Sequence, residues 1–372
     1  MVSSYIRRFY ISFATSILDV PPRLLAFLLF SLLLCVPLMK LSGYLLTILV
    51  LANINALFAT SWDLLVGRSG QISLGHALFF GIGAYSTALF SHYFGLPIWA
   101  TLLLSVPFGV LAALLVGFPC LRVKGPYLAL VTLAFPLIFV RLFFVDIPGV
   151  INIKEIMGAE FGIGGLPSFL SVPPYTPYQR GIAEYYVSLL LLGVCAVALY
   201  KIARSKTGII FVSILDDELA SKASGINTTR YKLMAFTISA FFASLVGGFY
   251  AHFMRGASTS TLLFGSPTAP GSFMVVIMTI FGGIGTIYGP IVGAYILTLL
   301  PTFLREIIEL VGELANLKLP IEEWTAIIYI IIAIVFIVVW SRGIATYVVE
   351  KLDELTEIEE IRKDRKRGKK RR

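Results

Sequence analysis

Long apolar runs alternate with short polar stretches along the 372 residues of this chain. An α-helix needs about 20 apolar residues to cross the hydrocarbon core of a bilayer. Ten runs approach that length, namely residues 24–39, 43–65, 78–93, 98–118, 127–145, 185–202, 233–252, 272–287, 291–304 and 324–340. Several of them are short or rich in glycine, so nine spans are the alternative. The pattern predicts an all-α fold, a polytopic bundle of about ten transmembrane helices.

Composition agrees with a membrane protein. Hydrophobic residues make up 58% of the chain and charged residues 14%, against roughly 45–50% and 25% in an average soluble domain. The mean hydropathy is +0.88. A water-soluble fold of this length could not bury so large an apolar share.

The formal net charge of +9 is concentrated at one end of the chain. Residues 362–372 hold nine Lys or Arg and one Asp, so the rest of the chain is nearly neutral. Basic segments beside a membrane are attracted to anionic headgroups. We therefore interpret the tail as a segment that binds membrane lipids, and we expect no nucleic-acid partner.

Lys and Arg favour the cytoplasmic loops of membrane proteins. They are enriched in residues 1–23, in the turns 67–75 and 121–126, in the loop 203–232 and in the tail. The segments 146–184 and 306–323 between them are acidic or mixed. Ten spans with both termini in the cytoplasm fit this pattern, except for Lys40, whose stem can snorkel.

We therefore expect a multi-pass protein of the plasma membrane. Its predicted parts are a cytoplasmic N-terminal segment (1–23), a transmembrane domain (24–345) that includes an extracytoplasmic loop (146–184) and a cytoplasmic loop (203–232), and a basic cytoplasmic tail (346–372). The extracytoplasmic loop is rich in Gly and Pro, which predicts irregular structure. The cytoplasmic loop predicts a helix that Asp216, Asp217 and Glu218 open and Gly225 ends.

Patterns that carry bond chemistry are absent from the sequence. It contains no P-loop, no H-E-x-x-H and no G-x-S-x-G. The three histidines are scattered, and we interpret them as packed or interfacial side chains rather than metal ligands. Charges inside the predicted spans are few: Asp63 lies near the inner end of the second span and Arg141 near the outer end of the fifth. A carrier driven by protons or sodium usually needs a buried carboxylate, so we expect the energy source to lie outside this chain.

Glycine-rich turns interrupt the spans at two places. The first includes Gly70, Ser73, Gly75 and His76, and the second includes Gly282, Gly283, Gly285, Gly289 and Pro290. Each turn leads through a short stretch into Gly-Ala-Tyr. Such interruptions at membrane depth are tolerated where the freed backbone faces protein or a water-filled cavity, and a matched pair points to a transport pathway at a repeat interface. We predict an inverted-repeat-like core with these residues at its pathway or hinge; close helix packing through small residues is the alternative reading.

Three stretches in register resemble a known family. They are ATSWDLLVGRSGQISLGHALFFGIGAY (59–85), LRVKGPYLALVTLAF (121–135) and DELASKASGINTTRYKLMAF (217–236). Together they resemble the M-type membrane permease of branched-chain amino acid ATP-binding cassette (ABC) transporters, and the likeness extends over roughly residues 45–304. The resemblance implies a non-catalytic subunit of an importer for Leu, Ile and Val that works by alternating access.

The resemblance also implies a set of partners. These are a second, H-type permease subunit, two cytoplasmic ATPase subunits that carry the ATP and Mg²⁺, and an extracytoplasmic solute-binding protein. No cofactor is expected on this chain. By analogy, the helix at 216–227 inserts into the ATPase, with the contact residues Asp216, Asp217, Glu218, Ala220, Gly225 and Ile226.

One departure from the family's pattern affects this contact. Members commonly carry basic residues just before the acidic cluster, whereas Ile209, Ile210, Phe211, Val212 and Leu215 are apolar here. The acidic residues are therefore the expected contact. Two alternatives remain open: a related importer for urea or short amides, and a stand-alone secondary carrier or channel. An intramembrane enzyme is disfavoured because the catalytic patterns are missing.

Overall fold

The computed structural model describes residues 30–31, 33–39, 41–121, 123, 125–142, 146–147, 151–158, 162–169, 176–259, 271–315, 320–339, 343–348 and 351. Its centre is the helix α3 (Gly43–Ser69), which is buried along most of its length. The hydroxyl of Ser42 accepts a hydrogen bond from the backbone N–H of Leu45 and caps the start of the helix. Gly70 ends it in the left-handed conformation, at φ 69°, which glycine adopts without steric cost.

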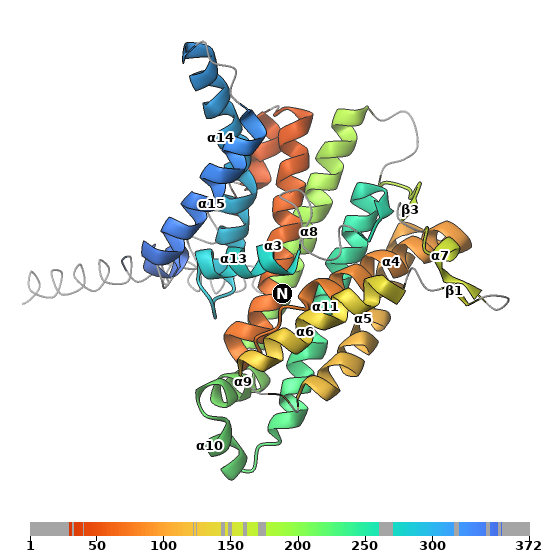
Figure 1. The fold of residues 1–372 in the computed structure, drawn as a ribbon, viewed down its shortest axis with the longest axis vertical. Helices are drawn as coiled ribbons and strands as arrows, with labels where there is room; N and C mark the ends of the chain where they lie inside the picture. Colours follow the sequence, from red (N-terminus) through yellow and green to blue (C-terminus); the bar gives the residue numbers. More distant parts are fainter. Residues whose placement is uncertain are drawn as a thin grey trace, which may run out of the picture.

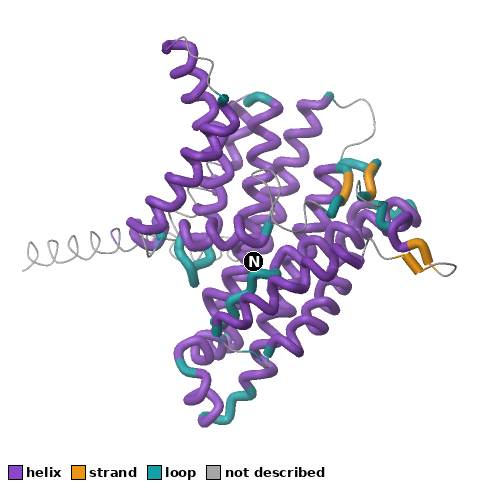
Figure 2. Tube along the Cα trace, viewed as in Figure 1, coloured by secondary structure: helices purple, strands orange, loops and turns teal. Residues whose placement is uncertain are grey.

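Helices on both sides of α3 complete the bundle (Figure 1). They are η1 (Val36–Met39), α4 (His76–Phe94), α5 (Ile98–Cys120), α6 (Pro126–Leu142), α7 (Ile153–Ile156), α8 (Pro177–Ala203), α9 (Lys206–Asp216), α10 (Glu218–Ala223), α11 (Thr228–Met254), α13 (Ser272–Gly282), α14 (Tyr288–Ala315) and α15 (Ile321–Val339). Strand structure within the described residues is limited to two short antiparallel pairs (Figure 2). The first joins β1 (Asp146–Ile147) to β2 (Ile151–Asn152), and the second joins β3 (Ile163–Gly164) to β4 (Gly256–Ala257).

The helices form two packed groups that share α3. On one side α3 contacts α8, α13 and α14, and α15 lies against α14; on the other side α11 packs on α4 and α5. Glycines allow the close approach of α4 and α11. A Cβ on Gly83 would overlap the carbonyl oxygen of Ser244, and a Cβ on Gly247 would overlap that of Phe80. Small residues at such contacts let helix backbones approach each other.

The predicted fold class, a polytopic helical bundle, is confirmed. Within the described residues, six helices are long and apolar enough to cross a membrane: α3, α5, α8, α11, α14 and α15. Two shorter apolar helices, α6 and α13, accompany them, and α4 has 19 residues. Residues 24–29 and 32 of the predicted span 24–39 lie outside the described residues, as do the predicted segment 1–23 and most of the tail.

Three predicted boundaries were wrong. The run 272–287 is not one span, because α13 ends at Gly282 and a turn follows. Residues 177–184 are not loop but the first turns of α8, which Thr176 and Gln179 start through a reciprocal capping box. Similarly α14 continues to Ala315, beyond the apolar run that ends at residue 304. The hydropathy pattern locates only the apolar part of a helix, which fits in lipid. Polar helical turns beyond that part give no hydropathy signal, so the sequence did not predict them.

The bundle has two distinct ends along α11. At the α10 end lie α9, α10, the last turn of α3 and the start of α11. At the β3 end lie the last turn of α11 and the β3–β4 pair, in which Ile163 pairs with Ala257. These two names are used below.

Candidate functional site

The first glycine turn folds back along the end of α3. The indole N–H of Trp62 donates to the carbonyl oxygen of Ser73 at 2.7 Å, and the backbone N–H of Leu74 donates to the hydroxyl of Thr132 on α6 at 3.0 Å. Gly75 is so close to α6 that a Cβ there would overlap the Thr132 carbonyl oxygen. The turn therefore brings the start of α4 inside the bundle rather than to its surface.

His76 begins α4 and is fully buried. Its Nε2 lies 2.8 Å from the hydroxyl of Ser61 on α3, and its ring stacks on Phe58 with centroids 5.0 Å apart. The next backbone N–H, of Ala77, donates to the hydroxyl of Ser272 at 2.9 Å. Ser61 lies two turns before the end of α3, or about 12 Å along the axis. The starts of α4 and α13 therefore meet beside α3, within the bundle, as in discontinuous membrane helices.

The second glycine turn meets the end of α3. Gly283 and Gly285 have φ values of 125° and 79°, which side chains other than glycine rarely adopt. The backbone N–H of Gly285 donates to Asp63 Oδ1 at 2.7 Å. Gly67 lies one helical turn after Asp63, and a Cβ on it would overlap the Gly285 backbone. We call these four residues, together with Gly343, the glycine junction.

Gly343 joins this junction from the far end of the sequence. It follows α15 with a φ of 85°, and a Cβ there would overlap the backbone of Gly283. Sequence reasoning did not select it, since one glycine outside a motif carries no signal. It also passed over Asp63 as a site residue, although a carboxylate within an apolar run was the available signal.

The predicted pathway residues are thus placed in two groups. Gly70, Ser73, Gly75 and His76 contact α9, α3 and α6; Gly70 lies against Leu215 of α9. The second group packs on itself, and a Cβ on Gly282 would overlap the carbonyl oxygen of Gly289. The two turns meet through Gly67 and Asp63 rather than through Gly70. Several of the predicted residues are buried, namely Gly75, His76, Gly282, Gly283, Gly289 and Pro290. In this conformation they allow neighbouring chain segments to pack closely. Their role in a pathway stays a prediction, as does the inverted-repeat relation.

The predicted coupling helix is divided into two helices. α9 ends at Asp216, and Asp217 then caps α10, accepting hydrogen bonds from the N–H groups of Leu219 at 2.8 Å and Ala220 at 3.0 Å. The predicted stop at Gly225 is present, with a φ of 83° directly after the last helical turn. Ser213 of α9 and Ser221 of α10 hold the two helices together through hydroxyl groups 2.7 Å apart.

Glu218 points inward rather than to solvent. Its carboxylate lies 2.9 Å from the ammonium group of Lys222 and 2.7 Å from that of Lys232 on α11. Burial raises the pKa of Glu218, but the hydrogen bonds from Lys232 and Lys222 outweigh it and lower the pKa to about 2. Lys232 is fourteen residues from Glu218 across a turn, so no local motif in the sequence indicates the pair.

Two leucines are exposed at the tip of α9 and α10. Leu219 is 72% exposed and Leu215 is 44% exposed. Asp216, Asp217, Ala220 and Gly225 are also exposed, whereas Ile226 is half-buried. The tip therefore presents two leucines beside two carboxylates, a surface suited to docking on another protein.

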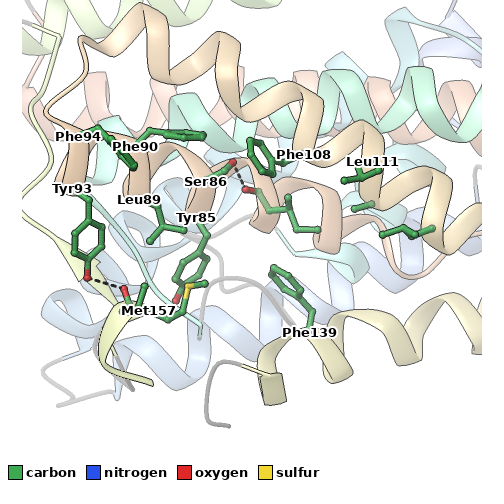
Figure 3. A pocket seen from close by; sticks show the side chains of 14 residues that line it. Tyr85, Ser86, Leu89, Phe90, Tyr93, Phe94, Phe108, Leu111, Phe139 and Met157 are labelled. Atoms are coloured by element: carbon green, nitrogen blue, oxygen red, sulfur yellow. Dashed lines mark hydrogen bonds between the residues drawn. The ribbon is translucent and has the colours of Figure 1, made fainter. Parts of the chain in front are cut away.

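Two hollows are lined by residues outside the glycine junction. A polar pocket of about 240 Å³ at the α10 end is lined by the last turn of α3 and by α9, with Glu218 and Lys232 at its wall. An apolar groove of about 690 Å³ lies between α4, α5, α6 and α7 (Figure 3). Figure 3 shows Phe90, Phe108 and Phe139 around it, and the hydroxyl of Tyr93 donates to the Ile156 carbonyl oxygen at 3.2 Å. Among the described residues no group of three or more His, Cys, Asp or Glu side chains is placed to hold a metal ion.

A bundle of membrane-length helices, in which two helices begin in the interior beside glycine turns and a helical tip projects, is typical of a multi-pass membrane permease. Comparison with known proteins identifies the family. The family model for the permease component of the branched-chain amino acid transport system matches residues 44–340. The chain belongs to this family.

Curated relatives agree with the assignment. The chain is 33% identical over 266 residues to LivM, the high-affinity branched-chain amino acid transport system permease protein of Salmonella typhimurium, covering 66% of this chain and 60% of that protein. It is 31% identical over 281 residues to LivM of Escherichia coli, covering 70% and 63%. The chain thus spans less than two thirds of the length of these relatives. A guanosine ABC transporter permease, NupQ of Bacillus subtilis, is 24% identical over 232 residues, covering 58% and 67%. No solved structure matches the chain.

Proposed function

We propose that this chain is a transmembrane permease subunit of an ABC importer that moves Leu, Ile and Val across the plasma membrane by alternating access. The tip formed by α9 and α10 carries the proposal. It projects from the bundle (Figure 1), it exposes Leu215 and Leu219, and it lies in the basic loop that is expected to be cytoplasmic. An exposed apolar tip on a membrane protein needs a partner, and in an ATP-driven importer that partner is the ATPase.

The proposed assembly has a second, H-type permease subunit, two ATPase subunits below the α10 end and an extracytoplasmic solute-binding protein at the β3 end. Both termini lie in the cytoplasm in this arrangement, and the basic tail faces anionic lipid. ATP-driven closure of the ATPase subunits moves the tip. The bundle then rearranges around the glycine junction, where glycines let three chain segments approach closely around the Asp63 carboxylate.

The structure changes the roles proposed for the acidic cluster. Asp217 is engaged as the cap of α10 and Glu218 pairs with two lysines, so Asp216, Leu215 and Leu219 are the side chains free to contact the ATPase. Asp217 and Glu218 hold the tip in the shape that docks. Reversing either charge alone is expected to loosen the tip, so that the bound ATPase no longer moves the bundle.

Uptake by cells tests the coupling role. Gly225→Val forces a β-branched residue to φ 83°, which costs of order 1–3 kcal/mol, and Asp217→Lys removes the helix cap. We expect both variants to reach the membrane and retain the partner subunits while leucine uptake falls at least about tenfold, because ATP hydrolysis no longer moves the bundle. Ala223→Val adds the same side chain at an exposed helical position two residues earlier and serves as the control. Normal uptake by both variants would refute the coupling role of α10.

Substrate competition tests the solute class. Excess Leu, Ile or Val should each suppress uptake of labelled leucine by the assembled system, whereas urea, short amides and guanosine should not. Suppression by urea or a short amide in place of the amino acids would assign the chain to the alternative importer.

A further inference from the structure

We infer that α11 is the rigid link that transmits motion between the two faces of the permease, with Lys232 and His252 as the positioning residues at its two ends. The inference rests on the proposed function, since it concerns how the docking tip acts on the extracytoplasmic side. It requires three things of α11: a fixed attachment to the tip, a fixed attachment to the opposite face, and stiffness between them.

The attachment at the α10 end is a cluster around Glu218. Its carboxylate binds Lys232 of α11 at 2.7 Å and accepts a hydrogen bond at 3.3 Å from the hydroxyl of Thr228, the first residue of α11. The side chain of Lys232 is only 12% exposed, so water screens this pair less than an ordinary surface pair. Any movement of α10 is therefore passed to the first two turns of α11.

The attachment at the β3 end is a cluster around His252 in the last turn of α11. Its Nδ1 lies 2.9 Å from the carbonyl oxygen of Pro167 and its Nε2 lies 2.8 Å from the hydroxyl of Thr101 on α5. A carbonyl oxygen only accepts, so Nδ1 carries the proton and donates to Pro167. The Phe169 ring meets the imidazole edge to face, with centroids 6.1 Å apart.

Backbone contacts strengthen this second attachment. The β3–β4 pair joins Ile163 to Ala257, three residues after α11 ends, and the N–H of Leu166 donates to the Arg255 carbonyl oxygen at 3.2 Å. Residues 162–169 therefore move with the end of α11. These residues belong to the loop that is expected to face the solute-binding protein.

The helix between the two attachments is long and lacks the usual causes of a kink. α11 has 27 residues without a proline, or about 40 Å at 1.5 Å per residue, whereas α5, α6 and α14 each contain proline. Sharp kinks in helices occur mainly at proline or at loosely packed glycine pairs. Gly247 and Gly248 of α11 are not loosely packed, because Phe80, Thr87 and Leu102 lie within overlap or tight contact of an added Cβ.

Contacts along its middle let α11 act on the interior of the bundle. The hydroxyl of Ser239 donates to the Ser61 carbonyl oxygen at 2.6 Å, and that of Ser244 donates to the Phe79 carbonyl oxygen at 3.1 Å. Ser61 and Phe79 both contact the side chain of His76. A shift of α11 along its axis would thus displace the start of α4, where the broken helices meet.

The test uses the complete complex, captured from native membranes through a tag on this chain and reconstituted in proteoliposomes. The measured quantity is the stimulation of ATP hydrolysis by leucine-loaded solute-binding protein, together with leucine uptake. We expect Lys232→Met and His252→Phe each to reduce the stimulation at least about fivefold, the lower range of ordinary coupling between sites, with the partner subunits still bound and hydrolysis without binding protein retained.

Lys222→Met is the matched control for the first variant. Lys222 binds the same carboxylate at a similar distance, 2.9 Å, but lies on α10 itself, so its loss leaves the link to α11 in place and should preserve the stimulation. Exchanging the charges, with Glu218→Lys and Lys232→Glu in the Lys222→Met background that removes the like charge beside residue 218, should recover part of the stimulation that Lys232→Met loses. Recovery would assign that loss to the pair between α10 and α11 rather than to the substitution at residue 232 alone.

Three outcomes separate the inference from the proposed function. Equal stimulation in Lys232→Met, Lys222→Met and the parent complex overturns the link at the α10 end. Unchanged stimulation in His252→Phe overturns the link at the β3 end. A parent complex that retains no ATPase, or that takes up leucine equally well without ATP, refutes the proposed function instead.

Discussion

At the scale of single residues, buried polar groups in this permease hold helices together. Asp63 shows the principle: its carboxylate lies in an apolar span, where an unpaired charge is costly, yet it accepts the backbone N–H of Gly285 at 2.7 Å. Gly285 lies in a turn and has no helical partner for that N–H. Asp63 thus satisfies a backbone group that glycine turns leave open.

Replacing Asp63 tests this role. Asp63→Leu leaves the Gly285 N–H without its acceptor, which we expect to destabilise the protein by about 1–3 kcal/mol. Asp63→Asn keeps an acceptor oxygen in place and should lose much less. Thermal unfolding of the two variants in detergent measures the difference, and equal melting temperatures would show that Gly285 needs no acceptor.

The charge on Glu218 sets the pH range of the coupling tip. Hydrogen bonds from Lys232 and Lys222 hold its pKa at about 2 against the opposing effect of burial. A carboxyl whose pKa is lower in the folded state stabilises the fold above its ordinary pKa, 4.5, and that stabilisation is lost as the pH falls from 4.5 towards 2. We therefore expect binding-protein stimulation of ATP hydrolysis to show no step from Glu218 between pH 5 and 8. A titration near pH 6 that Glu218→Gln abolishes would contradict the pairing.

At the scale of helices and turns, the hydropathy pattern predicted which helices exist and their order along the chain better than it predicted where each helix begins and ends. The run 43–65 is α3 (Gly43–Ser69) and the run 98–118 is α5 (Ile98–Cys120), because a membrane-length apolar segment has few alternatives to a helix. The separation of α9 from α10 was not predicted. It depends on Asp217, which both ends one helix and caps the next.

The sequence predicted two matched glycine turns, but it did not predict how the segments around them contact each other. Nothing in the sequence indicated that Gly67 and Gly285 would meet, or that Gly343 would join them. Such contacts are set by how helices pack, which the local pattern does not encode. The same holds for the Glu218–Lys232 pair, whose members are brought together by the turn at Gly225.

Close packing of α4 on α11 predicts opposite effects for two glycine substitutions. Gly247→Val places a branched side chain against the Phe80 carbonyl oxygen, and such overpacking typically costs about 1–3 kcal/mol. Gly181→Ala on α8 meets only Leu46 at 3.7 Å, and alanine is favoured over glycine within a helix by roughly 0.5–1 kcal/mol. Size-exclusion profiles and melting temperatures in detergent should show loss for the first and a small gain for the second. Equal tolerance of both would mean that α4 and α11 are not packed this closely.

At the scale of the whole molecule, contacts between distant segments connect the two ends of the bundle. The tip at the α10 end exposes leucines, and the opposite end holds residues 162–169 against α11. At the last turns of α3 the glycine junction joins segments from three parts of the sequence. In the proposed importer, the ATPase would supply energy at one face and the solute-binding protein would supply solute at the other.

The most direct test of this account is leucine accumulation in proteoliposomes that contain the complex captured through this chain. Solute-binding protein is supplied outside and ATP is enclosed inside. The account predicts that labelled leucine accumulates against its gradient only with hydrolysable ATP and only with the binding protein. Accumulation or rapid equilibration of leucine by this chain alone, without ATP and without partners, would contradict it.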